Sequence, residues 1–184
     1  MMHIDVGAIL HTSHDGVYTD LVTRTTGRTV RTQIEEHIAA GLPGSISIID
    51  FSAVGLLDFS CADEIVATLM RQCTDSPAED RYLLFAGITD GHLDAIEHVL
   101  EKHNLALVVR YTGLGTLRLV GVVKEVERVV WDAVVRLQPA GAASIATETG
   151  LDEEEVRLSL SALHRRRLLM KDGAMYRAPV SPVA

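Results

Sequence analysis

A serine at the start of a predicted helix has a setting in which its hydroxyl group could carry a phosphate. An apolar strand is predicted at 46–51, and Asp58-Phe59-Ser60 then opens an amphipathic helix predicted at 59–73. The N-terminus of a helix carries partial positive charge and suits a bound anion or an attached phosphate. Ser60 is therefore a candidate phosphoacceptor or partner contact. The residues that would share this site are Asp58, Cys61 and Asp63.

The alternative is a structural serine whose hydroxyl satisfies backbone N–H groups at the helix start. A phosphate on Ser60 would add a charge of about −1.5 to −2. Asp58, Asp63 and Glu64 are close to it in the sequence. We expect their repulsion to expel an acidic partner or to destabilise a docked state.

A second candidate site is an anion-binding group around three arginines. Guanidinium forks, hydroxyl groups and the N–H groups of a helix start are suitable ligands for an anion. The residues are Arg24, Thr25, Thr26, Gly27, Arg28 and Arg31. The alternative, which we favour, is that these arginines are solvated and pair with Asp20, Glu35 or other acidic residues.

The chain has eight histidines, but their spacing does not predict a metal site. His11 and His14 are separated by an expected turn. His92, His98 and His103 are six and five residues apart, so they do not share one helix face. No Cys-x-x-Cys or His-Glu-x-x-His pattern and no Ser-His-Asp grouping is recognisable. We expect no metal, no cofactor and no enzymatic activity.

The composition predicts a folded protein without a disulfide framework. Hydrophobic residues make up 47% of the 184 residues, which allows a sizeable core. Aromatic residues make up only 4%, which argues against a surface that stacks nucleic-acid bases. The two cysteines, twelve residues apart on one predicted helix, are too distant to bridge. No signal peptide or membrane span is visible, so we expect a cytoplasmic protein that does not contact a membrane.

The charge is unevenly distributed, which favours two structural units. Residues 1–115 contain 7 Lys and Arg against 16 Asp and Glu, a net charge of −9. Residues 116–184 contain 10 and 9, a net charge of +1. Nucleic-acid binding depends on positive charge that neutralises phosphates, so the first unit is a poor candidate for it.

Strands and helices are expected to alternate in the first unit, in the order β-β-α-β-α-β-α-β. This order predicts an α/β fold with a mixed sheet, parallel pairs and a first hairpin at one edge. The expected strands are 4–11, 17–23, 46–51, 82–86 and 105–110, with a hairpin turn at 14–16. The expected helices are 27–40, 59–73 and 90–103. Residues 111–121 are expected to form a glycine-rich joint that could hold one more strand.

The second unit has the pattern of a small winged helix-turn-helix domain. The expected elements are helices at 122–138, 144–149 and 152–169, a turn at 171–173 and a short strand at 174–177. The predicted domains are therefore an α/β domain at 1–115, a winged helix at 122–178 and a loose tail at 179–184.

Over residues 1–110 the chain resembles a STAS domain, the fold of bacterial anti-sigma-factor antagonists and of the cytoplasmic tails of sulfate transporters. The resemblance depends on the element order and on Asp58-Phe59-Ser60-Cys61-Ala62-Asp63, which stands where antagonists have Asp-Ser-Ser-Gly-Leu-Gly. It implies that Ser60 matches the serine that a partner kinase phosphorylates. The segment Thr23-Arg-Thr-Thr-Gly-Arg28 is more similar to a divergent STAS-like family of unassigned function.

Two interpretations of the second unit stay open. The third helix of such a domain begins with Asp152-Glu153-Glu154-Glu155, and these carboxylates would repel DNA. The basic residues come later and are candidates for DNA contact: Arg165, Arg166, Arg167, Lys171 and Arg177. The unit is therefore expected to bind either a protein or DNA.

Together these patterns predict a non-enzymatic regulatory or signalling protein. The STAS-like domain is expected to bind a protein partner, such as a kinase or an anti-sigma-type regulator, under control of phosphorylation at Ser60. The alternative is a DNA-binding transcription regulator with a STAS-like sensor domain. Homo-oligomer formation is left open by the sequence.

Overall fold

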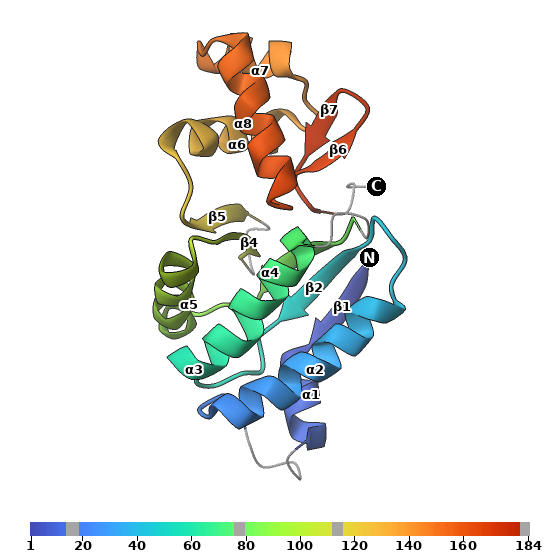
Figure 1. Cartoon of the computed structure of the whole chain (residues 1–184), viewed down its shortest axis with the longest axis vertical. Helices are drawn as coiled ribbons and strands as arrows, with labels where there is room; N and C mark the ends of the chain where they lie inside the picture. The colour runs from blue at the N-terminus through green and yellow to red at the C-terminus, as the bar shows by residue number, and fades with distance from the viewer. Residues whose placement is uncertain (14–18, 76–79, 112–115, 181–184) are drawn as a thin grey trace. The chain divides into compact units, whose positions relative to one another are not determined.

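The computed structural model describes residues 1–13, 19–75, 80–111 and 116–180 and divides the chain into two compact units (Figure 1). The first unit is Met1–Val122 and the second is Val123–Ala184. The first unit extends beyond the expected boundary at 115 because the last strand of its sheet follows that point. The expected turn at 14–16 and most of the expected tail at 179–184 lie outside the described residues.

The first unit is an α/β structure with a five-stranded mixed sheet in the order β1-β2-β3-β4-β5. The strands are β1 (Met2–Asp5), β2 (Ile46–Asp50), β3 (Tyr82–Ala86), β4 (Ala106–Arg110) and β5 (Leu117–Gly121). β1 to β4 are parallel neighbours, and β5 pairs antiparallel with β4. The prediction of a mixed α/β sheet is confirmed, and β2, β3 and β4 follow the apolar runs that predicted them.

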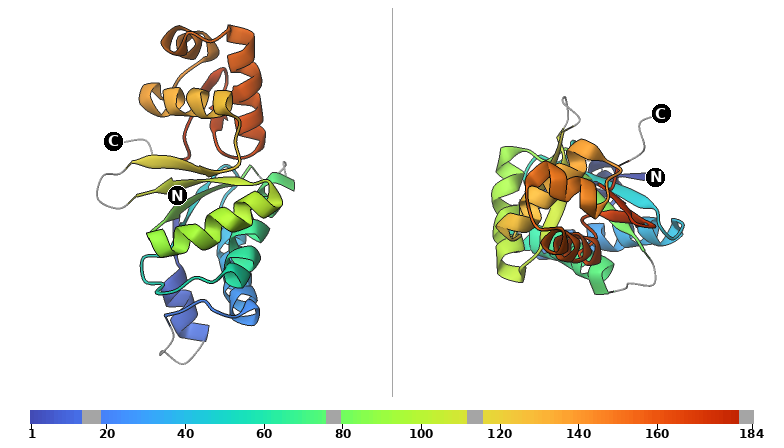
Figure 2. Two further views of the ribbon diagram at one scale, coloured as in Figure 1. Left: turned by 90° about the vertical axis from the view of Figure 1, so that its left-hand side faces the viewer. Right: turned by 90° about the horizontal axis from the view of Figure 1, so that it is seen from above.

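Helices cover one face of this sheet, as Figures 1 and 2 show. They are α1 (Val6–Ser13), α2 (Arg24–Ala40), α3 (Phe59–Ala62), the π-helical η1 (Asp63–Ala67), α4 (Thr68–Asp75) and α5 (Asp90–His103). The segments α3, η1 and α4 follow one another without a gap, so the helix expected at 59–73 is present. It contains one wider turn, of a kind that is frequent at functional sites.

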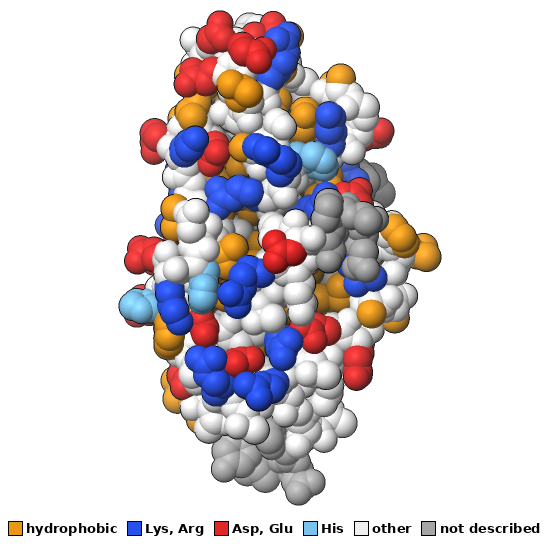
Figure 3. Space-filling view, in the orientation of Figure 1, with side chains coloured by type: hydrophobic (Ala, Val, Ile, Leu, Met, Phe, Trp, Pro, Cys, Tyr) orange, Lys and Arg blue, Asp and Glu red, His pale blue; other side chains and the backbone are white. Residues whose placement is uncertain are grey.

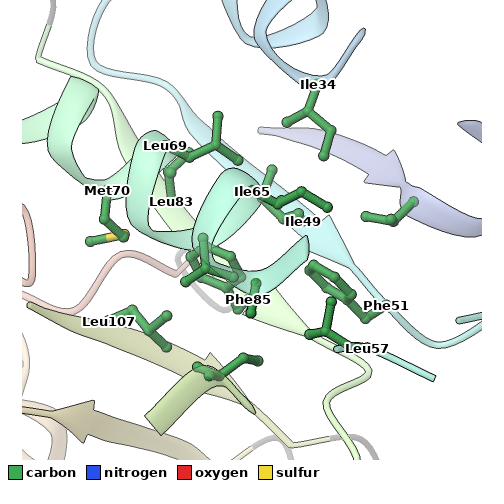
Figure 4. Close-up of a cluster of buried hydrophobic side chains, with 14 of the residues drawn as sticks. Ile34, Ile49, Phe51, Leu57, Ile65, Leu69, Met70, Leu83, Phe85 and Leu107 are labelled. Carbon is green, nitrogen blue, oxygen red and sulfur yellow. The ribbon is translucent and has the colours of Figure 1, made fainter. Parts of the chain in front are cut away.

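The core of the first unit lies between these helices and the sheet. Phe85 of β3 is fully buried and stacks against Phe51, with ring centroids 6.4 Å apart. Figure 4 shows side chains from the helices and from the strands meeting in this layer. The labelled residues are Ile34, Ile49, Phe51, Leu57, Ile65, Leu69, Met70, Leu83, Phe85 and Leu107. Burial of this apolar surface is the main term that fixes the α3–α4 segment on the sheet.

The strand predicted at 4–11 is wrong, because the chain turns into α1 at Val6. Val6, Ile9 and Leu10 are buried, and their spacing of three and four residues fits one helix face. The Asp5 carboxylate accepts a hydrogen bond from the Ala8 N–H at 2.9 Å, which stabilises the helix start. The short β1 pairs with β2 in parallel, so the sheet edge is not the predicted hairpin.

The strand predicted at 17–23 is also wrong for its described part. Leu21 forms only an isolated parallel bridge with Leu57. The next helix starts at Arg24, before the expected 27, because Thr23 is its N-cap and its hydroxyl accepts from the Thr26 N–H. The observed order of elements, β-α-α-β-α-β-α-β-β with α3–α4 taken as one helix, therefore differs from the predicted one.

The second unit consists of three helices followed by a two-stranded hairpin. Its elements are α6 (Glu125–Leu137), α7 (Ala142–Thr149), α8 (Glu153–Arg165), β6 (Met170–Asp172) and β7 (Met175–Arg177). Ala140 adds an antiparallel bridge to Tyr176. The turn expected at 171–173 is shorter than predicted, because Lys171 and Asp172 belong to β6. The last long helix ends at Arg165, not at 169, and the following residues enter the hairpin.

The described part of the chain contains no helix that is both long and apolar enough to span a membrane.

Candidate functional site

The Asp58 carboxylate organises the start of α3. Asp58 is the N-cap residue, and its Oδ1 accepts a hydrogen bond from the Cys61 N–H at 2.8 Å. The Ser60 hydroxyl donates to the same Oδ1 at 2.9 Å. Ser60 therefore does not satisfy the N–H groups of the helix start, as the structural alternative expected. Asp58 is the cap, and the Ser60 hydroxyl hydrogen-bonds to it. The Ser60 side chain is half-buried.

The loop before Asp58 is held by backbone hydrogen bonds to the chain segment before α2. The Leu21 N–H donates to the Leu56 carbonyl, and the Asp58 N–H donates to the Leu21 carbonyl, both at 2.8 Å. The buried His92 ring also contacts the Gly55 carbonyl of this loop, at 3.0 Å. The loop therefore has a fixed backbone next to Ser60.

This fixed loop presents apolar side chains to solvent. Leu56 is 61% exposed, and Val22 on the paired segment is 44% exposed. Because the backbone of this loop is already ordered, a partner that covers the exposed leucine does not have to order the loop as well. No local pattern in the sequence points to these two residues, because only the pairing of Leu21 with Leu57 brings their segments together.

The structure assigns Asp63 and Glu64 to a charge network between helices. Asp63 contacts His103 at 2.6 Å and Lys102 at 3.4 Å, both on α5. Glu64 contacts Arg24 at 2.9 Å and Arg28 at 3.7 Å, both on α2. Asp63 also contacts Arg24 of α2 at 3.2 Å, so it links η1 to both α2 and α5. Asp63 and Glu64 are thus engaged with the neighbouring helices, and the Ser60 hydroxyl contacts Asp58 instead.

The three arginines of the second candidate site pair with acidic residues, as in the alternative that we favoured. Arg24 bridges Asp63 and Glu64, at 3.2 and 2.9 Å. Arg31 contacts Glu35 at 2.7 Å. The expected partner Asp20 instead accepts from the Leu56 N–H.

Two further members of the arginine group, Thr26 and Gly27, have structural contacts at the start of α2. Thr25 and Thr26 lie in its first turn, where Thr26 contacts the hydroxyl of the capping Thr23 at 2.9 Å. Gly27 packs against Cys61: a Cβ atom on Gly27 would lie 3.0 Å from the Cys61 Cα. These contacts give Thr26 and Gly27 structural roles at the α2–α3 contact.

The ion pairs of Asp63 make the stability of the protein sensitive to acid. Burial alone would raise the pKa of Asp63, but hydrogen bonds from His103, Arg24 and Lys102 outweigh it and hold the pKa below its usual value. A lowered pKa in the folded state stabilises the fold above the unfolded pKa of about 3.9, and this contribution is lost as the pH falls through the folded value.

We therefore expect Asp63→Asn to lower the free energy of unfolding at pH 7 by about 1–2 kcal/mol, because it removes a charge that pairs with Arg24 and Lys102 and hydrogen-bonds to His103. The deficit should shrink as the pH falls through the lowered pKa of the folded state, because the wild-type carboxylate then becomes protonated itself. Urea unfolding at several pH values measures this. Asp94→Asn, at an exposed position on α5, is the matched control. A deficit that does not depend on pH would contradict the electrostatic explanation.

The Cys61 side chain is a structural contact between α3 and the start of α2. It is fully buried, and its thiol donates to the Thr23 carbonyl at 3.0 Å. Burial, with the nearby Asp58 carboxylate, raises the pKa of the Cys61 thiol to about 12. A thiol with this pKa is almost entirely protonated at neutral pH and is a poor nucleophile.

We expect Cys61 to resist alkylation by iodoacetamide at pH 8 in the native protein and to react once the protein is unfolded in urea. Mass spectrometry of the labelled peptides measures this directly. Cys73 is an internal comparison, because it is 8% exposed where Cys61 is 0% exposed. Rapid native labelling of Cys61 would show that the α2–α3 contact opens in solution.

The candidate DNA-contact residues in the second unit have different surroundings. Arg166 lies 3.5 Å from the buried Glu127, and burial lowers its pKa. Arg167 is buried, with a positive φ of 60°. Arg177 donates to the Val180 carbonyl at 3.0 Å. Arg165 is exposed, and the Lys171 ammonium lies 5.6 Å from the centroid of the Tyr176 ring.

The acidic start of α8 is partly neutralised within the helix. The Asp152 carboxylate caps the helix by accepting from the Glu154 and Glu155 N–H groups. Arg157 pairs with Glu153 and Glu154. The exposed surface at this end of α8 is therefore a mixture of charges.

The described residues contain no group of three or more His, Cys, Asp or Glu side chains that could hold a metal ion. Within this part of the chain, His92 contacts the Gly55 carbonyl and His98 packs edge-on against Phe59 at 4.8 Å.

Comparison with protein-family models, curated proteins and solved structures found no match for the chain.

Proposed function

We propose that this chain is a regulatory protein whose first unit binds a protein partner and is controlled by phosphorylation at Ser60. One observation carries the proposal: the half-buried Ser60 hydroxyl donates to the N-cap carboxylate of its own helix, beside a fixed loop with an exposed leucine. A docking surface and a modifiable group would thus lie on adjacent segments. The similarity of Asp58–Asp63 to the phosphorylated segment of STAS domains supports the same role.

Phosphorylation would act on the helix cap. The phosphate replaces the hydroxyl hydrogen, so the bond from Ser60 to Asp58 is lost. It also places a charge of about −1.5 to −2 against the carboxylate that accepts from the Cys61 N–H. The two anions compete for the positive end of the same helix. The first turn of α3 would then rearrange and change the surface next to Leu56.

For the second unit, we propose a winged helix-turn-helix module that binds protein. Its three helices, hairpin and Ala140 bridge fit that arrangement. Several of its basic residues are turned inward or paired, as Arg166 is with Glu127, and the start of α8 carries three glutamates. Both features favour a protein partner over the phosphate backbone of DNA.

The test of the proposed function compares Ser60→Ala and Ser60→Asp with the wild type. Ser60→Ala should retain the proteins that the wild-type chain captures from an extract of its source cells, and Ser60→Asp should lose at least one of them, because it adds the negative charge. The intact mass of protein from that source should fall by about 80 Da on phosphatase treatment. Ala53→Asp, at an exposed position on the same loop, is the control for added charge.

Identical capture by the two Ser60 variants, together with a mass unchanged by phosphatase, would overturn the switch. If Ala53→Asp loses the same proteins as Ser60→Asp, the effect belongs to negative charge on the loop and not to Ser60.

A further inference from the structure

The basic residues of the first unit are concentrated on one surface. Residues 1–115 contain only seven Lys and Arg, and four of them, Arg24, Arg28, Arg31 and Lys102, contact Asp63, Glu64 or both. Figure 3 shows blue side chains with red ones between them in the lower half of the view, over the helices labelled α2, α3 and α5 in Figure 1. We call these four residues the cationic patch.

The exposed part of this network is positive, although the network contains acids. The side chains of Arg28, Arg24 and Lys102 are 64%, 50% and 47% exposed. Asp63 and Glu64 below them are 13% and 12% exposed. A molecule that approaches from solvent therefore meets the cations first, and the acids act as anchors that orient them.

The rest of the unit makes this surface selective. With a net charge of −9 over residues 1–115, most of the surface repels an acidic partner and the cationic patch attracts it. Electrostatic complementarity of this kind guides a partner to one orientation more than it adds affinity. The patch also adjoins the candidate site, because the Lys102 ammonium lies 5.0 Å from the centroid of Phe59, the residue before Ser60.

From this geometry we infer that the cationic patch binds an acidic peptide segment of the protein partner. The inference deepens the proposed function by naming the chemistry of the partner. Arg24 and Arg28 are four residues apart on α2, so they lie about 5–6 Å apart on one face. Alternate side chains of an extended peptide are about 6.6 Å apart, which matches this spacing. A single phosphate ion fits less well, because the carboxylates of Asp63 and Glu64 occupy the space between the cations.

The test uses the full chain and a fluorescent peptide of about ten residues in which Glu and Ser alternate, followed by anisotropy at low ionic strength. We expect the peptide to bind, and its affinity to fall several-fold between about 30 and 150 mM salt. A peptide of alternating Lys and Ser should bind more weakly by about tenfold or more.

Arg28→Glu should weaken binding of the acidic peptide by about tenfold, because Arg28 is the most exposed cation of the patch. Arg71→Glu changes the net charge equally at an exposed position on α4 and should have less than about a twofold effect. Among the residues that the structure describes, Arg28 forms one ion pair, at 3.7 Å to Glu64, so the variant should fold, and its melting curve checks this.

Equal effects of the two charge reversals, or no binding by the wild type, would overturn the inference. Displacement of the peptide by millimolar inorganic phosphate, but not by chloride at equal ionic strength, would reassign the patch to phosphate and also overturn it. None of these measurements depends on Ser60. Binding of the peptide by a chain whose Ser60 variants behave alike would keep the patch and reject the switch.

Discussion

Replacing Gly87 by alanine is expected to lower the free energy of unfolding by about 3–4 kcal/mol, enough to remove much of the stability of a small domain. Gly87 follows β3 with a φ of 68°, a left-handed conformation that costs a non-glycine residue about 1–2 kcal/mol. A Cβ atom there would also lie 2.2 Å from the Ser52 backbone nitrogen and 2.6 Å from Asp50 Oδ1. The contact with the Ser52 nitrogen is with the backbone, so rotation of a side chain cannot relieve it.

Gly44→Ala is the matched control for this variant. Gly44 has a φ of 76°, but a Cβ atom there would meet nothing within 4 Å. It should therefore pay only the conformational cost, about 1 kcal/mol. Urea unfolding followed by circular dichroism measures both variants, and the fluorescence of Trp131, the only tryptophan, reports on the second unit. Equal losses for the two glycines would show that the loop after β2 moves aside at little cost.

The expected loss also concerns the candidate site. Ser52 and Asp50 begin the loop that leads to Asp58, and the Ser52 N–H donates to Asp50 at 2.9 Å. Displacing this turn would shift the fixed loop that carries Leu56. In the functional test above, a Gly87→Ala chain that still folds should bind the partner more weakly than its stability alone predicts.

Phe85→Ala is expected to lower the free energy of unfolding by about 3–5 kcal/mol, because it empties a large volume at the centre of the first unit. Phe85 is fully buried and stacks on Phe51 below the α3–α4 segment. Phe85→Leu keeps most of the apolar volume and should cost less, about 1–2 kcal/mol. The order of these two losses, measured by urea unfolding, tests whether cavity formation is the cause.

Phe59→Ala provides the contrast at the candidate site. The Phe59 ring is half-buried and packs against His98 at 4.8 Å and Lys102 at 5.0 Å. Its removal should cost only about 1 kcal/mol, since much of the ring already contacts solvent. A loss as large as that of Phe85→Ala would mean that Phe59 belongs to the core and is not available to a partner.

The α/β class of the first unit was predictable because its signals are local. The continuous apolar runs at Ile46–Asp50 and Tyr82–Ala86 are typical of strands buried on both faces, and the chain forms β2 and β3 there. The N-terminal segment was not predictable in the same way. Residues 6–11 are apolar enough for a strand, but the spacing of Val6, Ile9 and Leu10 also fits a helix. Only the hydrogen bond from the Ala8 N–H to Asp5 at the helix start favours the helix over the strand.

The candidate site likewise has one part that the local sequence predicts and another that only the tertiary structure decides. The sequence by itself determined that Asp58 and Ser60 open a helix after a buried strand, because capping and apolar periodicity act over a few residues. Only the tertiary structure decided what surrounds them. Asp63 meets Arg24 and His103, each about 40 residues away, because α2 and α5 both pack against η1. Such pairings depend on how helices pack on the sheet, and no local pattern encodes that.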